Sequence, residues 1–264
     1  MNFLNFLPKF SIILALLLPF IGCVDDESDA NDPASAFASA REYYDDENFE
    51  IAVQKLGEFK SRFPYSKLAA LAELFVANSH FELGNYEEAA IDYKQFVKLH
   101  PNHDKVPFAM YRIGESYWID APEDVDSDQE LTQTAIDEWQ NLLDDFPSSK
   151  YAKIAKEKIT IGERRIAESH EFIADFYCKM EIYHACAYRF IKILEQYPQY
   201  KDLRKKSLSQ ASEALLEIAV VKKQNPKSDK NIFFQRMTWQ EIEDKAKTFA
   251  KLAAKIPDSS KDDD

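Results

Sequence analysis

Three kinds of residue in this chain could support chemistry: five histidines, a run of acidic side chains and three cysteines. His100 and His103 lie close together at a predicted helix end, and two imidazoles could share a metal ion. No third or fourth ligand of suitable type follows nearby, whereas protein zinc sites use three or four. We therefore interpret the two histidines as part of a solvated turn and expect no metal.

The motifs that commonly mark an enzyme are also missing from the sequence. It has no Gly-rich phosphate loop, no Gly-x-Ser-x-Gly turn and no His-Glu-x-x-His helix. A helical-repeat hydrolase would need a nucleophile beside a base, and no such pair is evident. The sequence therefore predicts a protein without enzymatic activity and without a cofactor.

An acidic insertion, residues 120–130, superficially resembles a calcium loop. Aspartates alternate from Asp124 to Asp128. A calcium loop of this kind requires glycine at its sixth position and glutamate at its twelfth, where this chain has Gln129 and Ala135. We interpret the insertion as a solvated surface loop that could contact a partner.

Cys178 and Cys186 are expected on facing helices, across a turn. In an exported protein the oxidising surroundings allow a disulfide between them. Two cysteines where helices cross closely can also serve as small buried hydrophobic residues. The sequence leaves both alternatives open.

The third cysteine, Cys23, directly follows an apolar leader. Lys9 supplies a positive charge, and residues 10–21 are almost all apolar but too few to span a bilayer as a resident helix. Gly22 and Cys23 resemble the cleavage site of bacterial lipoproteins, where the cysteine receives a covalent lipid and becomes the N-terminus. We expect a signal peptide over residues 1–22 and lipidation of Cys23; a plain cleaved signal and an uncleaved anchor are the alternatives.

The residues after Cys23 suggest where the lipid would place the protein. Several acyl chains on one cysteine anchor a protein stably. Val24 follows the cysteine in place of aspartate, and by resemblance to enterobacterial sorting rules this favours the outer membrane, with the folded part facing the periplasm. The Asp-rich composition predicts that residues 23–33 form the lipidated cysteine and a disordered tether, and residues 258–264 an acidic disordered tail.

Charge and composition narrow the class of protein further. The 264 residues carry a formal net charge of -13, so a phosphate backbone would be repelled and nucleic acid is not an expected partner. Only 5 glycines stand against 13 tyrosines and 19 phenylalanines, which favours helices packed through aromatic side chains. The sequence has no Asn-Gly or Asp-Gly pair between runs of alternating apolar and polar residues, so evidence for strands is thin.

A helix–turn–helix repeat organises the chain, and it is most regular over residues 71–101. Two apolar helical patterns flank Gly84, which can adopt the left-handed conformation that ends a helix. Ala77 and Ala89 are small enough for the two helices to approach closely, and Pro101 ends the second helix. This is the tetratricopeptide pattern, a unit of about 34 residues.

Further units precede and follow this one, each ending at a proline. The spacing of these prolines widens along the chain: Pro64, Pro101, Pro147, Pro198 and Pro257. The predicted fold class is therefore all-α, a tetratricopeptide-repeat superhelix of about five helix pairs with a concave groove. We expect repeats one to three over residues 34–147 and repeats four and five over residues 148–257.

The C-terminal repeats depart from the regular length. The leading helix of repeat four is expected to begin near Tyr151 and to run for about 28 residues. Repeat five is expected to contain a helix over residues 203–222, a loop over 223–237 and a last helix over 238–256. Thr238, with Glu241 three residues later, predicts a capping box at the start of that last helix.

Leading helices line the concave face of tetratricopeptide arrays, so their residues are the candidates for peptide binding. The candidate groove residues are Phe37, Arg41, Tyr44, Leu74, Asn78, Phe81, Tyr111, Glu115 and Trp118. Arg41 and Asn78 occupy positions that hold a bound backbone or carboxylate in peptide-binding arrays, and aromatic neighbours offer contact area at small entropic cost. Such a groove suits an extended peptide with a C-terminal carboxylate or alternating aromatic residues. The alternative is that the aromatic residues pack against the next repeat.

Several stretches taken together resemble the BamD family, the outer-membrane lipoproteins of the β-barrel assembly machinery. In the family's order, after a lipoprotein signal, these stretches are Phe63–Ser66, Gly84–Ala89, Phe96–His103 and Ala109–Gly114, followed by Phe172–Tyr177 and Tyr183–Pro198. The similarity is strongest in repeats one to three and weak after about Leu203. In that region repeat five departs most from the regular unit of about 34 residues.

The resemblance implies a non-enzymatic scaffold with two binding regions. Repeats one to three would bind C-terminal targeting signals of unfolded outer-membrane proteins. The C-terminal half would dock on the POTRA domain nearest the barrel of BamA, alongside other lipoproteins of the machinery. Arg189 lies where the family has an arginine on the second helix of repeat four, and it is the first candidate for that contact. A nearby basic set could support docking electrostatically: Lys201, Arg204, Lys205 and Lys206.

A different assignment is a periplasmic tetratricopeptide adaptor of a cell-envelope system similar to Tol-Pal. Those proteins usually carry an N-terminal coiled coil and no lipid. Here the repeats begin about eleven residues after Cys23, which leaves no room for the several heptads of a coiled coil.

Overall fold

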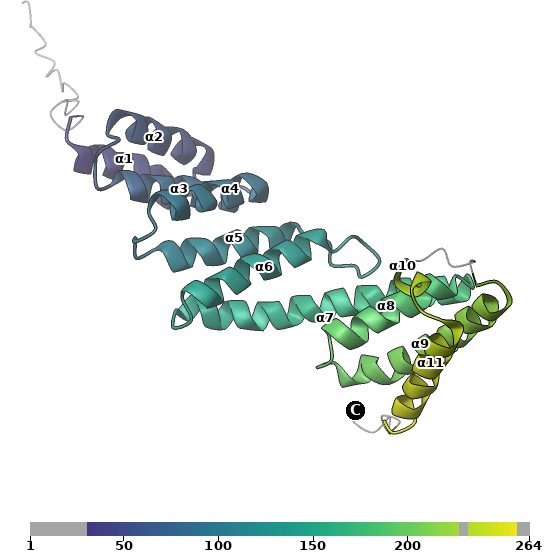
Figure 1. The fold of residues 1–264 in the computed structure, drawn as a ribbon. Helices are drawn as coiled ribbons and strands as arrows, with labels where there is room; N and C mark the ends of the chain where they lie inside the picture. The colour runs from purple at the N-terminus through teal and green to yellow at the C-terminus, as the bar shows by residue number, and fades with distance from the viewer. Residues whose placement is uncertain (1–30, 227–231, 258–264) are drawn as a thin grey trace, which may run out of the picture.

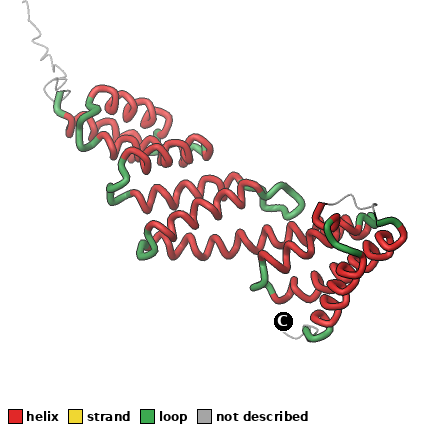
Figure 2. The backbone as a smooth tube through the Cα atoms, in the orientation of Figure 1, coloured by secondary structure: helices red, strands yellow, loops and turns green. Residues whose placement is uncertain are grey.

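The computed structural model describes residues 31–226 and 232–257, and within these ranges every regular element is a helix (Figures 1 and 2). The leader, Cys23 and the acidic tail lie outside the described residues, so what the sequence indicates about them stays a prediction. The helices are α1 (Pro33–Asp45), α2 (Phe49–Arg62), α3 (Ala69–Glu82), α4 (Tyr86–Leu99), α5 (Val106–Asp120), α6 (Glu130–Asp145), α7 (Lys150–Lys179), α8 (Tyr183–Gln196), α9 (Lys201–Gln224), α10 (Ile232–Gln235) and α11 (Trp239–Ala253).

Consecutive helices pack as pairs, and the pairs stack on one another along the chain. The pairs are α1/α2, α3/α4, α5/α6, α7/α8 and α9/α11, which we call repeats one to five. Each second helix also packs against the leading helix of the next repeat, as α2 does against α3 and α4 against α5. The predicted all-α tetratricopeptide architecture of about five helix pairs is confirmed.

The turns inside repeats one, two and four share one backbone conformation. Glu47, Gly84 and Glu181 have φ angles of 61°, 77° and 58°, in the left-handed region. The amide of the following residue donates to a carbonyl five residues earlier, as in Asn85 N to His80 O at 2.9 Å, which is the bond of a Schellman helix end. Only the second of these turns uses glycine, so the fold holds two glutamates in a conformation that L-residues avoid.

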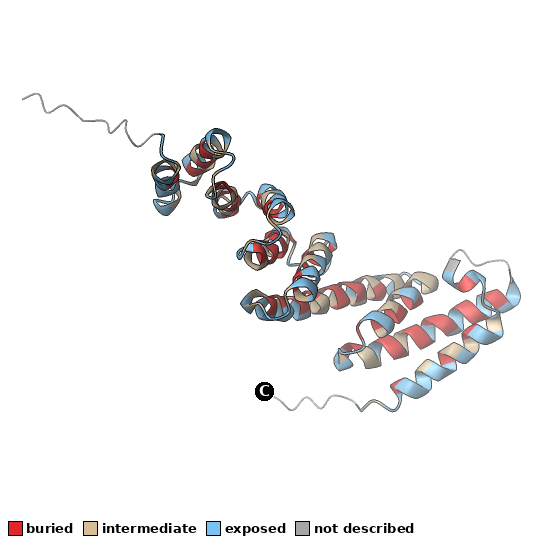
Figure 3. Ribbon diagram, turned by 60° about the vertical axis from the view of Figure 1, so that its left-hand side comes forward, coloured by how far each residue is buried: buried red, intermediate tan, exposed pale blue. Residues whose placement is uncertain are grey.

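Small residues lie where the two helices of a repeat cross. Ala77 and Ala89 are completely buried, as are their counterparts Ala52 and Ala174. In repeat three the leading helix has Gly114 at this place, and a β-carbon there would overlap the indole of Trp139. The close approach that the sequence predicted through Ala77 and Ala89 is therefore present, and Trp139 packs against a glycine where the pattern varies. Figure 3 shows the buried residues as stripes along the helices, between exposed stretches.

Helix α7 extends through both halves of the molecule. It has 30 residues, begins after Ser149, whose hydroxyl accepts from the Tyr151 amide, and confirms the unusual length expected of it. Its first half packs against α5 and α6, and its second half against α8 and α9. One hydrophobic cluster accordingly continues from α3 to α11, and a smaller one lies in repeat one and the start of α3.

Two details at the ends of the described chain differ from the expectations, and a third agrees. The first helix begins at Pro33, where Asp32 accepts from the Ser35 amide at 3.0 Å, so the expected tether ends at the helix N-cap. The expected loop over 223–237 is wrong in part, because α9 continues to Gln224 and the short α10 lies within it; residues 227–231 are outside the described ranges. The capping box of Thr238 is confirmed.

Cys178 and Cys186 form a disulfide between α7 and α8. Of the two alternatives that the sequence left open, the structure therefore has the covalent bridge. Cys186 is also buried at the helix crossing, with 1% of its surface exposed, so it fills the small-residue position as well.

Candidate binding surfaces on the leading helices

Four of the nine candidate groove residues are core residues. Phe37, Leu74, Phe81 and Tyr111 expose only 5% to 9% of their surface and belong to the two hydrophobic clusters. This corrects the expectation that these side chains line an open groove. The leading helices direct their largest apolar residues toward the neighbouring helices, because those contacts hold successive repeats together.

An aromatic ledge formed by Arg41, Tyr44 and Phe75 lies between repeats one and two. The Tyr44 ring meets the Phe75 ring edge-on, with 4.9 Å between their centres, and the Arg41 guanidinium is 5.7 Å from the same ring. Arg41 also pairs with Asp45 at 2.9 Å, and both side chains are 48% exposed. An exposed pair of this kind contributes little free energy, so Arg41 can exchange Asp45 for a ligand carboxylate.

Arg112 of α5 is the centre of a polar network that the sequence analysis missed. Its guanidinium contacts Glu82 and Glu115, each at 2.9 Å, and lies 3.5 Å from the centre of the Phe81 ring. Its Nε donates to the Tyr93 hydroxyl at 3.4 Å. The Arg112–Glu115 spacing of three residues on one helix was the available signal.

Asn78 is joined to this network through Tyr93. The Tyr93 hydroxyl donates to Asn78 Oδ1 at 2.6 Å, and burial raises the pKa of Tyr93, which keeps that proton in place. The Asn78 carbonyl is therefore used inside the protein, and its amide group keeps two N–H donors. The side-chain amide of Asn78 can therefore only donate, and it suits an acceptor such as a backbone carbonyl or a carboxylate oxygen of a bound peptide.

The aromatic ledge and the Arg112 network lie close enough to interact electrostatically. Burial, followed by the charge of Glu82, raises the pKa of Tyr44, while Arg112 acts in the opposite direction. Glu115 in turn accepts a hydrogen bond from the Tyr111 hydroxyl at 2.9 Å. The surface on α1, α3 and α5 thus combines aromatic edges, amide donors and one readily available arginine.

Trp118 is a contact of α7 and not part of the aromatic ledge. The Arg165 guanidinium is 4.1 Å from its ring centre, and the Lys158 ammonium is 5.5 Å away. A β-carbon at Gly162 would come within 3.2 Å of the indole. Trp118 therefore fixes α7 against α5.

Arg189, the candidate for partner docking, lies in a cleft of about 390 Å³ between α7, α8 and the segment before α6. Its Nη1 is 2.8 Å from His170 Nδ1, which must accept because arginine has only donors. Burial, with Lys192 and Arg189, lowers the pKa of His170 to about 4, so the imidazole is neutral. Arg189 therefore keeps its charge beside a neutral partner, and Lys192 adds a second positive charge to the cleft.

The end of the acidic insertion forms one wall of this cleft. Ser127, Asp128 and Gln129 line it. Gln129 donates to the main-chain oxygens of Asp124 and Ser127 at 2.9 and 3.2 Å and accepts from Thr132 at 2.8 Å. Gln129, which stands where a calcium loop has glycine, thus holds the loop together through these hydrogen bonds.

The basic residues of α9 do not join Arg189. Lys201, Arg204 and Lys205 are absent from the lining of the cleft. Lys206 pairs with Glu171 at 3.2 Å and Asp175 at 2.6 Å, which ties α9 to α7. The basic residues that were expected to act together are therefore divided between two places. Lys192, three residues after Arg189, is the second basic residue in the lining of the cleft, where the sequence predicted residues of α9.

No helix within residues 31–226 and 232–257 is both long enough and apolar enough to cross a membrane.

Comparison with known proteins gives one family. Residues 29–231 match the family model YfiO, described as an outer membrane lipoprotein. The outer membrane protein assembly factor BamD of Rickettsia prowazekii is 28% identical over 191 residues, covering 71% of this chain and 75% of that protein. The corresponding factor of Vibrio cholerae is 24% identical over 204 residues, covering 73% and 84%. A solved tetratricopeptide repeat protein from Parabacteroides merdae aligns with 87% of this chain and 94% of its own, at 12% identity and a TM-score of 0.27. Because the family model matches well over half of the chain, the protein belongs to the YfiO family of outer membrane lipoproteins.

Proposed function

We propose that this protein is a scaffold in the assembly of outer-membrane proteins. The observation that carries the proposal is the family match over residues 29–231. The same chain is also similar to the BamD assembly factors of several bacteria. Membership of this family makes the chain a non-enzymatic scaffold. It would act by holding two different polypeptides on two surfaces.

The first surface, on α1, α3 and α5, is proposed to hold C-terminal targeting segments of unfolded outer-membrane proteins. Aromatic side chains of an extended segment would pack on Tyr44 and Phe75, whose rings already meet edge-on at 4.9 Å. Its terminal carboxylate would replace Asp45 on Arg41, and its backbone would accept from the amide of Asn78. This pairing supports an extended, carboxylate-terminated client.

The second surface, the cleft around Arg189, is proposed to dock on a POTRA domain of BamA. Arg189 and Lys192 present two positive charges, and His170 beside Arg189 is neutral. Asp128 is the one carboxylate in the lining, so the cleft keeps an excess of positive charge, with which an acidic side chain of the partner would form a charge-assisted hydrogen bond. Other lipoproteins of the machinery are proposed as additional partners.

The attachment to the membrane is proposed to be a lipid on Cys23. The support is the Gly22–Cys23 pair after the apolar leader, together with the family description of an outer membrane lipoprotein. The folded repeats would then face the periplasm at the inner surface of the outer membrane. Mass spectrometry of the mature N-terminus tests this: an unmodified Cys23 would refute it.

Photo-crosslinking tests the client surface. A photoreactive residue in place of Tyr44 should capture unfolded outer-membrane protein precursors in envelope extracts. The same residue in place of Ile91, an exposed position on α4, is the matched control and should not. Equal capture at both positions would refute the assignment of this face.

Co-purification tests the docking surface and separates it from the Tol-Pal-like alternative. The full chain, solubilised from envelopes in detergent, should recover a large β-barrel protein with POTRA domains. Arg189→Glu should reduce this recovery at least about tenfold, because it places like charge against an acidic partner. Lys153→Glu, at an exposed position of α7, is the control. Recovery of only peptidoglycan-linked partners would contradict the assembly role.

A further inference from the structure

Repeat one fills the space behind its turn with an aromatic side chain. Tyr44 lies three residues before Glu47, the left-handed residue of the turn. Its ring meets Phe49 edge-on at 5.5 Å and also reaches the next leading helix, where it packs 4.9 Å from Phe75. One aromatic residue thus closes the gap between the turn and the following repeat.

Repeat two uses the same arrangement with a guanidinium added. Phe81, three residues before Gly84, meets Tyr86 edge-on at 5.2 Å. On the next leading helix, Arg112 lies 3.5 Å from the Phe81 ring centre and pairs with Glu115 at 2.9 Å. The gap is closed by an arginine that stacks on an aromatic ring and is paired with a carboxylate.

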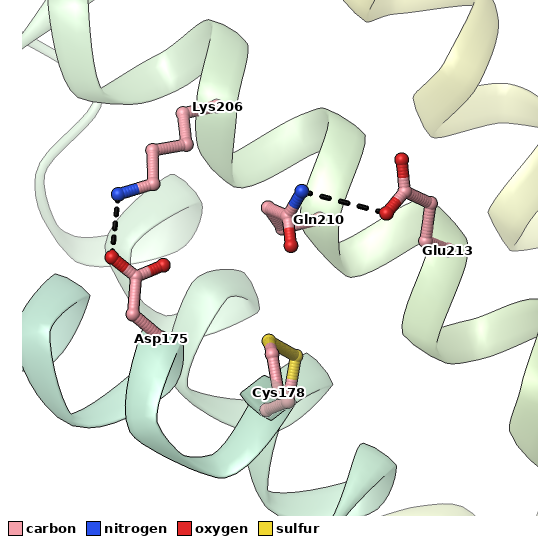
Figure 4. The surroundings of a disulfide bond; sticks show 6 residues. Asp175, Cys178, Lys206, Gln210 and Glu213 are labelled. Carbon is pink, nitrogen blue, oxygen red and sulfur yellow. Dashed lines mark hydrogen bonds and ion pairs between the residues drawn. A yellow bond between two sulfur atoms is a disulfide. The ribbon is translucent and has the colours of Figure 1, made fainter. Parts of the chain in front are cut away.

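Repeat four has a half-cystine where repeats one and two have this aromatic residue. Cys178 lies three residues before Glu181 and is bonded to Cys186. Figure 4 shows the disulfide facing the part of α9 that carries Gln210 and Glu213. A cystine does not reach across the gap as a ring does, and a cleft of about 370 Å³ remains between the turn and α9.

The lining of this cleft has two carboxylates and no cation. It comprises Cys178, Tyr183, Cys186, Gln210, Glu213, Ala214, Leu216 and Glu217. Lys206, which Figure 4 shows on the same stretch of α9, is already paired with Asp175 at 2.6 Å. Tyr183 occupies the place of Tyr86, two residues after the left-handed residue, so an aromatic surface is present. The cleft therefore has carboxylates and an aromatic ring but no guanidinium; its ring, Tyr183, is the counterpart of Tyr86 and not of Phe81, on which Arg112 stacks.

We propose that this cleft binds an arginine side chain of a partner protein. The guanidinium would pair with Glu213 and Glu217 and stack on Tyr183, while Leu216 and Ala214 pack against its aliphatic stem. Arginine fits better than lysine because a planar guanidinium both stacks on a ring and bonds carboxylates through several N–H groups. The site lies on α7–α9, away from the client surface, and does not depend on the proposed function.

A pair of short peptides tests the proposal on the full chain, expressed with its own leader and purified in detergent. The probes are acetyl-Gly-Ser-Arg-Ser-Gly-amide and the same peptide with neutral citrulline in place of arginine. The arginine peptide should shift the methyl NMR signals of Ala214 and Leu216. The citrulline peptide should bind at least about tenfold more weakly than the arginine peptide. Equal binding of the two peptides, or shifts only elsewhere, would overturn the proposal.

Three variants separate charge, space and the disulfide. Glu213→Gln with Glu217→Gln keeps the shape and should weaken the arginine peptide about tenfold. Cys178→Phe with Cys186→Ala installs the residue pair of repeat two, fills the cleft and should abolish binding. Cys178→Ala with Cys186→Ala leaves the space open and should keep binding. If the filled variant does not fold, the glutamine pair decides alone, and unchanged affinity in that pair refutes the site.

Discussion

Arg112 and Arg189 are both partly buried, yet their surroundings differ in charge. Arg112 lies between two carboxylates at 2.9 Å and against the Phe81 ring, so its charge is neutralised within the protein. Arg189 bonds His170 at 2.8 Å, and that imidazole is neutral because burial lowers its pKa to about 4. The comparison indicates that Arg112 holds repeats two and three together, whereas Arg189 has charge left for a partner.

Arg112→Leu should have the largest effect on stability. It would leave Glu82 and Glu115 without their cation and remove the stacking on Phe81. We expect the free energy of unfolding, measured by urea denaturation, to fall by about 2–3 kcal/mol, less than for a fully buried pair because the Glu82 side chain is 40% exposed. Arg189→Leu should cost less than about 1 kcal/mol. Equal losses in the two variants would remove the distinction between these arginines.

Glu82→Gln with Glu115→Gln should make Arg112 resemble Arg189. The glutamines keep the shape and the hydrogen-bond acceptors but remove both negative charges, so we expect a loss of about 1–2 kcal/mol. The freed charge should bind a carboxylate-terminated peptide more tightly than its amide, measured by calorimetry. The wild-type protein, in which Arg112 is neutralised and only Arg41 is proposed to contact the carboxylate, is the reference, and the preference for the acid should exceed the wild-type preference. No gain in this preference over the wild type would show that these two carboxylates do not control the charge of Arg112.

The pH dependence of stability should reveal the neutral state of His170. Its folded pKa of about 4 lies below that of an ordinary histidine, so the unfolded chain binds more protons between these values. Stability contributed by this residue is therefore complete above about pH 7 and is lost as the pH falls toward 4. His170→Asn, which keeps an acceptor for Arg189 but does not titrate, should show a smaller fall in the denaturation midpoint. An identical profile in the variant would contradict the assignment.

Arg41→Leu should have the smallest effect on stability. Its pair with Asp45 is 48% exposed on both sides, so we expect a change within about 0.5 kcal/mol. Binding of a carboxylate-terminated peptide should nevertheless weaken, measured by fluorescence anisotropy against the peptide amide. Unchanged preference for the acid would show that Arg41 is not the carboxylate contact.

Much of the fold could be predicted because it depends on local pattern. Gly84, the alanines at the helix crossings and the prolines after the second helices mark a repeat without knowledge of its neighbours. The length of α7 and the capping box of Thr238 were also predicted, since continuous apolar periodicity and a cap are local signals. The short α10 was missed because its four residues are too few to show a period.

The binding surfaces were predicted less completely because they depend on contacts between repeats. The sequence places Phe37 and Phe81 on leading helices, but only packing decides that they are buried. Arg112 and Lys192 were overlooked, since their importance comes from Glu82 and His170, which lie 30 and 22 residues away in the chain. Residues expected to act together, such as Arg189 and Lys201, were separated by the geometry of α8 and α9.

The unbroken length of α7 sets a minimum reach for any polypeptide that touches both ends of the protein. Thirty helical residues at 1.5 Å each give a rod of about 45 Å. An extended chain advances by roughly 3.4 Å per residue, so at least about 13 residues are needed to travel that distance. A polypeptide that touched both ends of α7 would therefore have to contribute an extended segment of at least this length, and a shorter peptide could reach one end only.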